Sequence, residues 1–371
     1  MVRRHTGAIA ALALAGLTAF GVAAAHEETT TVRWGPIDLP AATEEGPGEL
    51  WNEIAGLSGL RAAVIDGITG SGDFEVNKPC EDCYIVGIKP NLVLENGETA
   101  NFNNGVMLHH VVNLNFSNPD VTCRPSIFSP QPIKLLGALA GGNERIFAAG
   151  NERTAGQLTD DYGYYLAEGD HLGLIYHLMN MNPEPKTVYF EYTFIYQDAA
   201  DHDLDSVRPI WMDVDQCGTS TVSVPAGYSD VTWDWQSDRT HRLVGAGGHI
   251  HNYGINVAWT NTSTSETLCN SLAGYEKGSP YKPVGPGTGD SDAHPEYPET
   301  VDSHRLGLEN YEGNIATMSI CTPGRDAPKT ARRDEMRLNA QIYRPDQGYH
   351  DMGIMVGFMD EKFCLTDFWC F

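Results

Sequence analysis

The sequence predicts an all-β protein built from two tandem antiparallel β-sandwich domains. Its 371 residues are enough for two domains of ordinary size. Glycine (39 residues) and proline (21 residues) separate many short runs rich in Val, Ile, Tyr and Thr, which is typical of strands joined by turns. The order of these runs fits pairs of antiparallel sheets better than an alternation of strands and helices.

The first 75 residues are expected to lie outside the two domains. Residues 1–25 have the features of a secretory signal peptide, because Arg3 and Arg4 precede an apolar stretch that ends in three alanines. That stretch is short for a membrane span, so we expect no membrane association after cleavage. Residues 26–75 form a polar extension with a candidate strand at Thr31–Trp34 and a candidate helix at Glu49–Val64. We therefore expect a secreted protein, either extracellular or periplasmic.

Residues 76–205 are predicted to form the first domain. Its strand-like runs are bounded by turn signals: Tyr84–Ile88, Leu92–Leu94, Val106–Phe116, His171–Met179 and Val188–Tyr196. An acidic connection, residues 198–215, leads into the second domain, residues 206–371. The runs expected to form strands there are Thr219–Val224, Val231–Trp235, Arg242–Trp259, Glu266–Leu272, Ala316–Cys321, Arg337–Arg344 and Met352–Met359. A Gly-, Pro- and Asp-rich insertion, Tyr275–His304, is expected to be a long surface loop.

The charge of the chain excludes some classes of binding partner, and its cysteine content predicts disulfides. Lys and Arg number 24 against 49 Asp and Glu, and the net charge of −25 argues against nucleic acid or an anionic membrane as a partner. Eight cysteines in an exported chain predict four disulfides. Spacing does not settle the pairing. The candidates are Cys80–Cys83, Cys269–Cys321 and Cys364–Cys370, with Cys123–Cys217 left over. A redox or zinc role for Cys80 and Cys83 is disfavoured against a structural bridge.

Two histidine pairs, one in each expected domain, are the candidate metal ligands. His249 and His251 are two apart on a strand-like run, so both rings can point to one face and reach one ion. His109 and His110 are adjacent, so they can share an ion only if the strand bends or bulges there. His177, on the run His171–Met179, is the expected third ligand. Taken alone, either pair fits equally well with one ring in the core and one in solvent.

The second pair needs a further ligand, and two methionines are candidates. Met336 precedes the run Arg337–Arg344, and Met352 begins the next run after a turn. The ordinary role of a buried methionine is core packing. A site with two histidines and one methionine would favour copper, especially Cu(I), over zinc, because the thioether is a soft ligand.

The order of these motifs resembles the copper type II ascorbate-dependent monooxygenases, the family that includes peptidylglycine hydroxylase and dopamine β-hydroxylase. The resemblance covers roughly residues 80–360 and rests on the adjacent histidines, a third histidine before Asn-Pro, the His-x-His pair and a late methionine. It implies two jelly-roll-like domains, each holding one mononuclear copper. The implied ligands are His109, His110 and His177 for the first copper and His249, His251 and a methionine for the second. In the family the methionine starts the strand after a hairpin partner, which favours Met352 over Met336.

The resemblance also implies a reaction, the hydroxylation of an aliphatic C–H of a small molecule with O₂ and a one-electron donor such as ascorbate. His249, His251 and Met352 would be the catalytic set. The chain departs from the peptide-amidating members, because Gly247, Ile354 and Val356 replace the side chains that hold a peptide carboxylate. Three alternatives remain: a secreted copper-binding protein without turnover, a one-copper polysaccharide monooxygenase that uses His26 as its N-terminus, and an interaction module without metal.

Overall fold

The computed structural model confirms the all-β prediction. It describes residues 27–43, 48–51, 76–122, 143–159, 161–216, 220–276, 314–344, 347–360, 364–366 and 369–370. Within these ranges the regular elements are strands and two short 3₁₀ turns, Phe102–Asn104 and Gly324–Asp326. None of the elements in these ranges is a helix long and apolar enough to cross a membrane. The expected signal peptide, residues 1–25, and His26 lie outside the described residues.

The strands up to residue 206 form two sheets that we call the first sandwich. One sheet has the order β1-β10-β3-β8-β11, with β4 beside β10 and β7 beside β3. The other sheet has the order β2-β9-β5-β6. The strands are β1 (Glu28–Leu39), β2 (Gly48–Trp51), β3 (Cys83–Lys89), β4 (Leu92–Leu94), β5 (Val106–Asn115), β6 (Glu144–Gly150), β7 (Gly156–Gln157), β8 (Tyr162–Leu166), β9 (Leu172–Asn180), β10 (Lys186–Asp198) and β11 (Asp205–Ser206).

The strands from residue 208 onward form the second sandwich. Its two sheets have the orders β12-β23-β15-β19, with β20 beside β15, and β14-β21-β16-β17-β18. Two small two-stranded sheets, β13 with β22 and β24 with β25, complete it. The strands are β12 (Arg208–Asp213), β13 (Val222–Val224), β14 (Gly227–Gln236), β15 (His241–Ile250), β16 (Gly254–Asn261), β17 (Glu266–Glu276), β18 (Asn314–Met318), β19 (Ile320–Cys321), β20 (Lys329–Thr330), β21 (Glu335–Arg344), β22 (Gly348–Asp351), β23 (Gly353–Asp360), β24 (Cys364–Thr366) and β25 (Trp369–Cys370).

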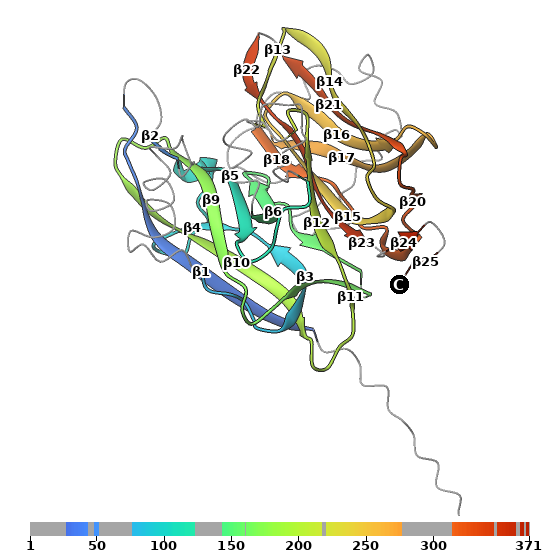
Figure 1. The fold of residues 1–371 in the computed structure, drawn as a ribbon. Helices are drawn as coiled ribbons and strands as arrows, with labels where there is room; N and C mark the ends of the chain where they lie inside the picture. Colours follow the sequence, from blue (N-terminus) through green and yellow to red (C-terminus); the bar gives the residue numbers. More distant parts are fainter. Residues whose placement is uncertain are drawn as a thin grey trace, which may run out of the picture.

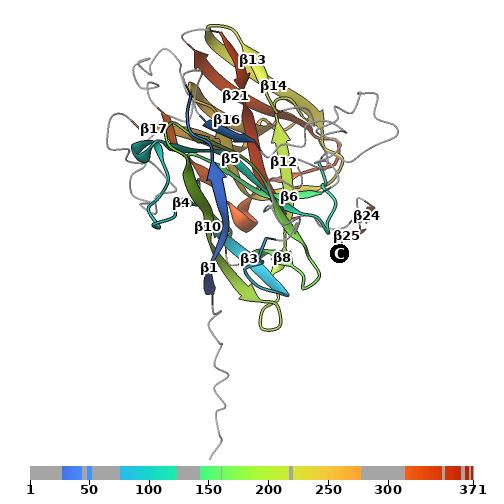
Figure 2. The same cartoon turned by 90° about the vertical axis from the view of Figure 1, so that its left-hand side faces the viewer.

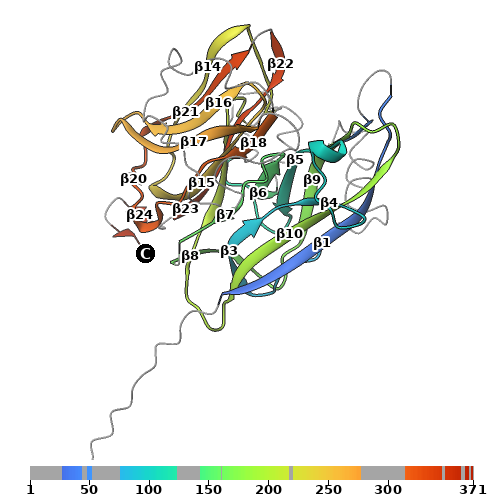
Figure 3. The ribbon, with the colours of Figure 1, turned by 180° about the vertical axis from the view of Figure 1, so that it is seen from behind.

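Alternating apolar side chains explain how each pair of sheets closes. Leu108, Leu178 and Phe190 are fully buried between the two sheets of the first sandwich. Trp259 and Leu338 play the same part in the second sandwich. On a strand, successive side chains point to opposite faces. The sheets β2-β9-β5-β6 and β12-β23-β15-β19 therefore each cover their own core with one face and present the other face to the neighbouring sandwich. Figure 1 and the reverse view in Figure 3 show the two sandwiches side by side, with β5, β6, β12 and β15 between the outer sheets.

The facing sheets of the two sandwiches are in direct contact. Val112 and Ala148, from the first sandwich, pack against a small apolar cluster of Trp211, Met352 and Ile354 from the second. Strand β12 runs beside β6 in this contact, as Figure 2 shows after a quarter turn. The histidine-bearing stretches of β5, β9 and β15 belong to these same two facing sheets. Any site that they form is therefore shared between the sandwiches.

Three sequence expectations require correction. The extension, residues 26–75, does not lie wholly outside the first sandwich, because its residues Glu28–Leu39 form β1 and pair with β10. The run Arg242–Trp259 is not one strand, because β15 ends at Ile250 and β16 begins at Gly254, with Tyr253 at φ +77° in the turn. Residues 48–51 of the expected extension form strand β2, which pairs with β9, so the candidate helix Glu49–Val64 begins within a strand. Residues 52–64 of that candidate helix lie outside the described residues. Most of the insertion Tyr275–His304 also lies outside them.

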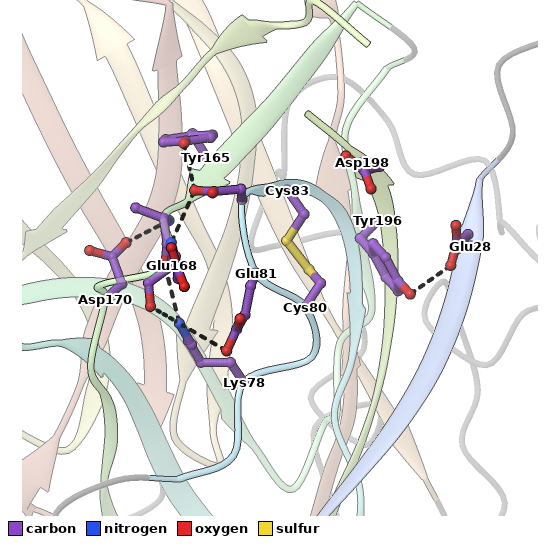
Figure 4. Close-up of a disulfide and its surroundings, with 12 residues drawn as sticks. Glu28, Lys78, Cys80, Glu81, Cys83, Tyr165, Glu168, Asp170, Tyr196 and Asp198 are labelled. Carbon is purple, nitrogen blue, oxygen red and sulfur yellow. Dashed lines mark hydrogen bonds and ion pairs between the residues drawn. A yellow bond between two sulfur atoms is a disulfide. The ribbon is translucent and has the colours of Figure 1, made fainter. Parts of the chain in front are cut away.

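Two of the expected disulfides are present. Cys80 and Cys83 are bonded at the start of β3, where Lys78 pairs with Glu81 and Tyr196 donates a hydrogen bond to Glu28 (Figure 4). Cys269 and Cys321 are bonded and join β17 of one sheet to β19 of the other. The backbone register places Cys364 opposite Cys370. Cys123 and Cys217 lie outside the described residues.

Candidate metal centre

A β-bulge brings the adjacent histidines of β5 to the same ion-sized space. The register between β5 and β9 pairs Leu108 with Leu178 and then slips, so that His110 pairs with His177 and His109 is the extra residue. Such an extra residue bends the strand and redirects its side chain. The candidate ligand nitrogens of His109, His110 and His177 all lie within 4.8 Å of one another. The bulge that a shared ion site at His109 and His110 would need is therefore present.

His249 lies on β15, in the sheet that faces β5 and β9, and His251 follows the end of that strand. His249 is opposite Ile354 of β23, and the ring centroids of His249 and His251 are 5.5 Å apart. Gly248, the residue before His249, lies on the other face of the strand. A Cβ on Gly248 would lie 2.8 Å from the Ser271 side chain, and its N–H donates to the Ser271 hydroxyl over 2.9 Å. The glycine thus lets β15 approach β17 while the two histidines face the first sandwich.

The two histidine groups touch one another. The ring centroids of His109 and His251 are 4.9 Å apart, only slightly farther than those of His109 and His177 at 4.4 Å. His109 therefore contacts both groups, and five imidazoles from two sandwiches form one continuous cluster. The sequence motifs, which place one group in each expected domain, do not reveal this contact.

A buried carboxylate completes the cluster. Glu152 follows β6 in the first sandwich, and its Oε1 lies 2.8 Å from Nδ1 of His249 in the second. Glu152 is 6% exposed and His249 is 9% exposed. Burial opposes the charged form of both groups, but their mutual attraction outweighs it, so the pKa of Glu152 is lowered and that of His249 is raised.

His109 and His110 of the first group are held neutral. Burial, with the neighbouring His251 and His249 as smaller contributions, lowers the pKa of His109 to about 3. Burial and the surrounding histidines also lower the pKa of His110 well below its ordinary value. A neutral imidazole keeps a lone pair on one nitrogen, and metal binding requires that lone pair.

The donor set fits a transition metal. Nδ1 of His249 is hydrogen-bonded to Glu152, and the buried Nε2 of the same ring has no hydrogen-bond partner among the described residues. A buried polar nitrogen without a partner is costly, and a metal ion at this position would remove that cost. Clusters of imidazoles suit copper, zinc, iron or nickel, and a thioether in the set would favour Cu(I).

The candidate methionines lie in different surroundings. Met336 is buried in the core of the second sandwich, opposite Trp235 and Asn261. Met352 lies at the contact between the sandwiches, next to Ile354 and Trp211. The register pairs His249 with Ile354 and Ile250 with Gly353, so its continuation by one residue sets Met352 opposite His251.

A pocket of about 220 Å³ opens beside the cluster. Its wall includes His109, His249 and His251, together with Glu152 and Asn151 of the first sandwich. Met107, Tyr253 and Arg344 also line it. Arg344 pairs with the buried Asp351 over 2.8 Å and lies over the Tyr253 ring. The pocket is large enough for a small organic group in contact with the histidines.

Sequence reasoning missed Glu152 and Met107. Glu152 is one of 49 acidic residues and lies far from His249 along the chain, so no local motif marks it. Met107 is two positions before His109, and a strand periodicity of two could have placed it on the ligand side of β5.

Comparisons with known proteins point to copper chemistry. No family model matches the chain. It is 32% identical over 154 residues to a probable copper-dependent oxygenase, M1, of a Phoma species, covering 40% of this chain and 36% of that protein. It is 29% identical over 169 residues to a probable copper-dependent oxygenase, clz3, of Cochliobolus lunatus, covering 43% of this chain and 50% of that protein. The chain thus spans half or less of the length of these relatives.

Among solved structures, the STIV MCP matches 90% of this chain with a TM-score of 0.31 and 10% identity. The major capsid protein P2 of bacteriophage PM2 matches 92% with a TM-score of 0.28 and 6% identity. Similarity at this level supports no conclusion about function. The sequence matches, in contrast, relate about two-fifths of this chain to proteins named as probable copper-dependent oxygenases.

Proposed function

We propose that this protein is a copper-dependent monooxygenase that hydroxylates an aliphatic C–H bond of a small molecule. The observation that carries the proposal is the five-histidine cluster between the sandwiches, with three ligand nitrogens within 4.8 Å of one another. Relatives named as probable copper-dependent oxygenases favour copper over the other metals that imidazoles bind. The reaction consumes the substrate, O₂, two electrons and two protons and yields the alcohol and water.

We assign two mononuclear copper sites. His109, His110 and His177 would hold one ion, and His249, His251 and Met352 would hold the other. The shared face of His249, Ile354 and Met352 supports the choice of Met352 over Met336, which belongs to the second core. When bound, copper supplies one-electron redox chemistry with O₂, and ascorbate or a similar donor provides the electrons one at a time.

The chain's own residues bind and orient the substrate. The pocket beside His249 and His251 places a small molecule next to the ligands of the second site. Asn151 and Tyr253 offer polar groups at its wall, and Met107 and Ile315 offer apolar surface. This mixture suits an organic molecule with an apolar skeleton and a few polar substituents.

We also propose that the protein is exported. The apolar segment after Arg3 and Arg4 and the two disulfides support an oxidising location, since disulfides persist mainly outside the cytosol.

Metal analysis of the purified protein tests the proposal. The wild type should bind about two copper ions, and His110→Ala and His249→Ala should each bind about one. His171→Ala, an exposed histidine just before β9, is the matched control and should keep both ions. Zinc, or no metal, in the wild type would contradict the proposal.

Ascorbate-dependent O₂ uptake by the copper-loaded protein separates turnover from binding. A monooxygenase should consume O₂ when reductant and a suitable small molecule are both present, and His249→Ala should abolish this uptake. Copper binding without uptake across a panel of small organic compounds would support the alternative, a copper-binding protein without catalysis.

A further inference from the structure

Glu152 and His249 form a carboxylate–imidazole hydrogen bond between the two sandwiches. Oε1 of Glu152 accepts a hydrogen bond from Nδ1 of His249 over 2.8 Å and a second from the backbone N–H of Gly150 over 2.9 Å. Both residues are buried, with side chains that are 5% exposed for Glu152 and 11% exposed for His249. A buried carboxylate is stable only when such hydrogen bonds compensate its lost hydration, so this pair is a built feature of the contact.

At Gly150 the carboxylate of Glu152 and the ring of His249 lie so close to the backbone that no side chain fits at this position. A Cβ on Gly150 would lie 2.5 Å from Oε2 of Glu152, 2.8 Å from Cε1 of His249 and 2.9 Å from the carbonyl oxygen of His109. Each of these distances is too short for an unstrained contact. A glycine at this position therefore brings the carboxylate, the ring of His249 and the bulge of β5 together.

The hydrogen bond selects one form of the His249 ring. An ionised carboxylate only accepts hydrogen bonds, so the proton of the neutral ring must be on Nδ1. Nε2 then carries the lone pair, and this atom is buried without a hydrogen-bond partner among the described residues. Carboxylates that hold the far nitrogen of a ligating histidine orient the ring and raise its affinity for the metal.

We infer that Glu152 is a positioning residue for His249, which holds the ring with Nε2 available as a ligand and makes the second copper site depend on the first sandwich. The identity of the metal as copper rests on the proposed function, whereas the position of the proton on the His249 ring does not. Docking of the two sandwiches and metal binding at His249 are then coupled, because the first sandwich supplies the group that prepares the ligand of the second.

Nitrogen-15 NMR of the metal-free protein, with labelled histidine and at alkaline pH, tests the state of the ring. In the wild type the His249 resonances should show the proton on Nδ1. Glu152→Gln keeps an acceptor oxygen and should keep this form. Glu152→Leu keeps most of the volume but no acceptor, and should shift the proton toward Nε2, which is the preferred form of a free ring. An unchanged ring in Glu152→Leu would overturn the inference.

Copper titration against a competing chelator tests the consequence for the metal. Glu152→Leu should weaken the binding of one of the two copper ions by about 10-fold or more, and Glu152→Gln by less, with the binding of the other copper unchanged. Glu144→Gln is the matched control, because Glu144 is an equally buried glutamate of β6 that bonds to Tyr164 instead of a histidine. It should bind copper like the wild type. Unchanged affinities in folded Glu152→Leu and Glu152→Gln would overturn the inference.

The two experiments separate this inference from the proposed function. If the wild type binds no copper but Glu152→Leu changes the ring, the proposed function fails and the positioning role remains. If copper binds and O₂ is consumed, but neither the His249 ring nor the copper affinity depends on Glu152, the proposed function stands and the positioning role of Glu152 fails. Should Glu152→Leu fail to fold, the wild-type spectrum decides, because a proton on Nε2 of His249 in the metal-free wild type contradicts the inference.

Discussion

The imidazole rings of His109 and His251 lie 4.9 Å apart, although one belongs to a bulge on β5 of the first sandwich and the other follows β15 of the second. This contact joins two histidine groups that the sequence motifs place in separate domains. It places both histidine groups at the interface between the sandwiches.

Replacement of His109 should affect both histidine groups. His109→Ala removes a candidate ligand of the first group and the ring that packs against His251. We expect the first copper to be lost and the affinity for the second to fall by about 10-fold, because His251 loses a neighbour that orients it. His110→Ala, whose described ring contacts are with His109 and His177, should affect the first copper alone. Chelator competition measures both affinities. An effect of His109→Ala confined to one copper would show that the ring contact carries no coupling.

Gly150→Ala should disrupt the contact between the sandwiches. The added methyl group would meet the carboxylate of Glu152 and the ring of His249 at 2.5 and 2.8 Å. Overpacking of this kind costs about 1–3 kcal/mol. Thermal or denaturant unfolding should show this loss, and copper affinity should fall with it. In Gly156→Ala the nearest atom to the new methyl group is 3.7 Å away, so this control should unfold like the wild type. Equal stabilities would contradict the close packing at Gly150.

Met352→Leu tests the sulfur ligand. Leucine keeps the volume and the apolar contacts with Trp211 and Ile354, so the fold should be retained with a loss below about 1.5 kcal/mol. If Met352 ligates copper, X-ray absorption of the reduced protein should lose its sulfur signal, and Cu(I) affinity should fall more than Cu(II) affinity. Met107→Leu is the matched comparison, because Met107 lines the pocket beside His109. Loss of the sulfur signal in Met107→Leu alone would identify Met107 as the ligand.

Glu144→Gln should change how stability depends on pH. Burial raises the pKa of Glu144, although the hydroxyl of Tyr164, which donates to it over 2.7 Å, acts in the opposite direction. A carboxyl group with a higher pKa in the folded chain holds its proton more tightly there. Its stabilising contribution is therefore complete below the ordinary value of 4.5 and is lost as the pH rises through the folded value.

Glutamine carries no charge to desolvate and still offers an acceptor to Tyr164. Relative to the wild type, Glu144→Gln should thus be more stable at neutral pH than below pH 4.5. Denaturant unfolding at the two pH values measures the difference. A variant that is less stable by the same amount at both values would show that the burial of charge at Glu144 is not the cause.

Local pattern predicted most of the strands, because the alternation of side chains along a strand depends on neighbouring residues alone. The runs Tyr84–Ile88 and Leu92–Leu94 lie in β3 and β4, and Arg337–Arg344 lies in β21. The pattern failed at Arg242–Trp259, where the turn at Tyr253 lies inside an apolar run. The need for a bulge at His109 could also be derived from the sequence, since adjacent strand residues otherwise point to opposite faces.

The sequence by itself determined the all-β class and the candidate ligands, and it offered Cys80–Cys83 and Cys269–Cys321 as candidate disulfides that the structure then confirmed. Only the tertiary structure decided that His109 meets His251 and that Glu152 meets His249. Those contacts depend on how two sheets dock face to face, and docking is set by the shape and charge of whole surfaces. Residues far apart along the chain carry no local signal of such a meeting, so it could not be read from the motifs.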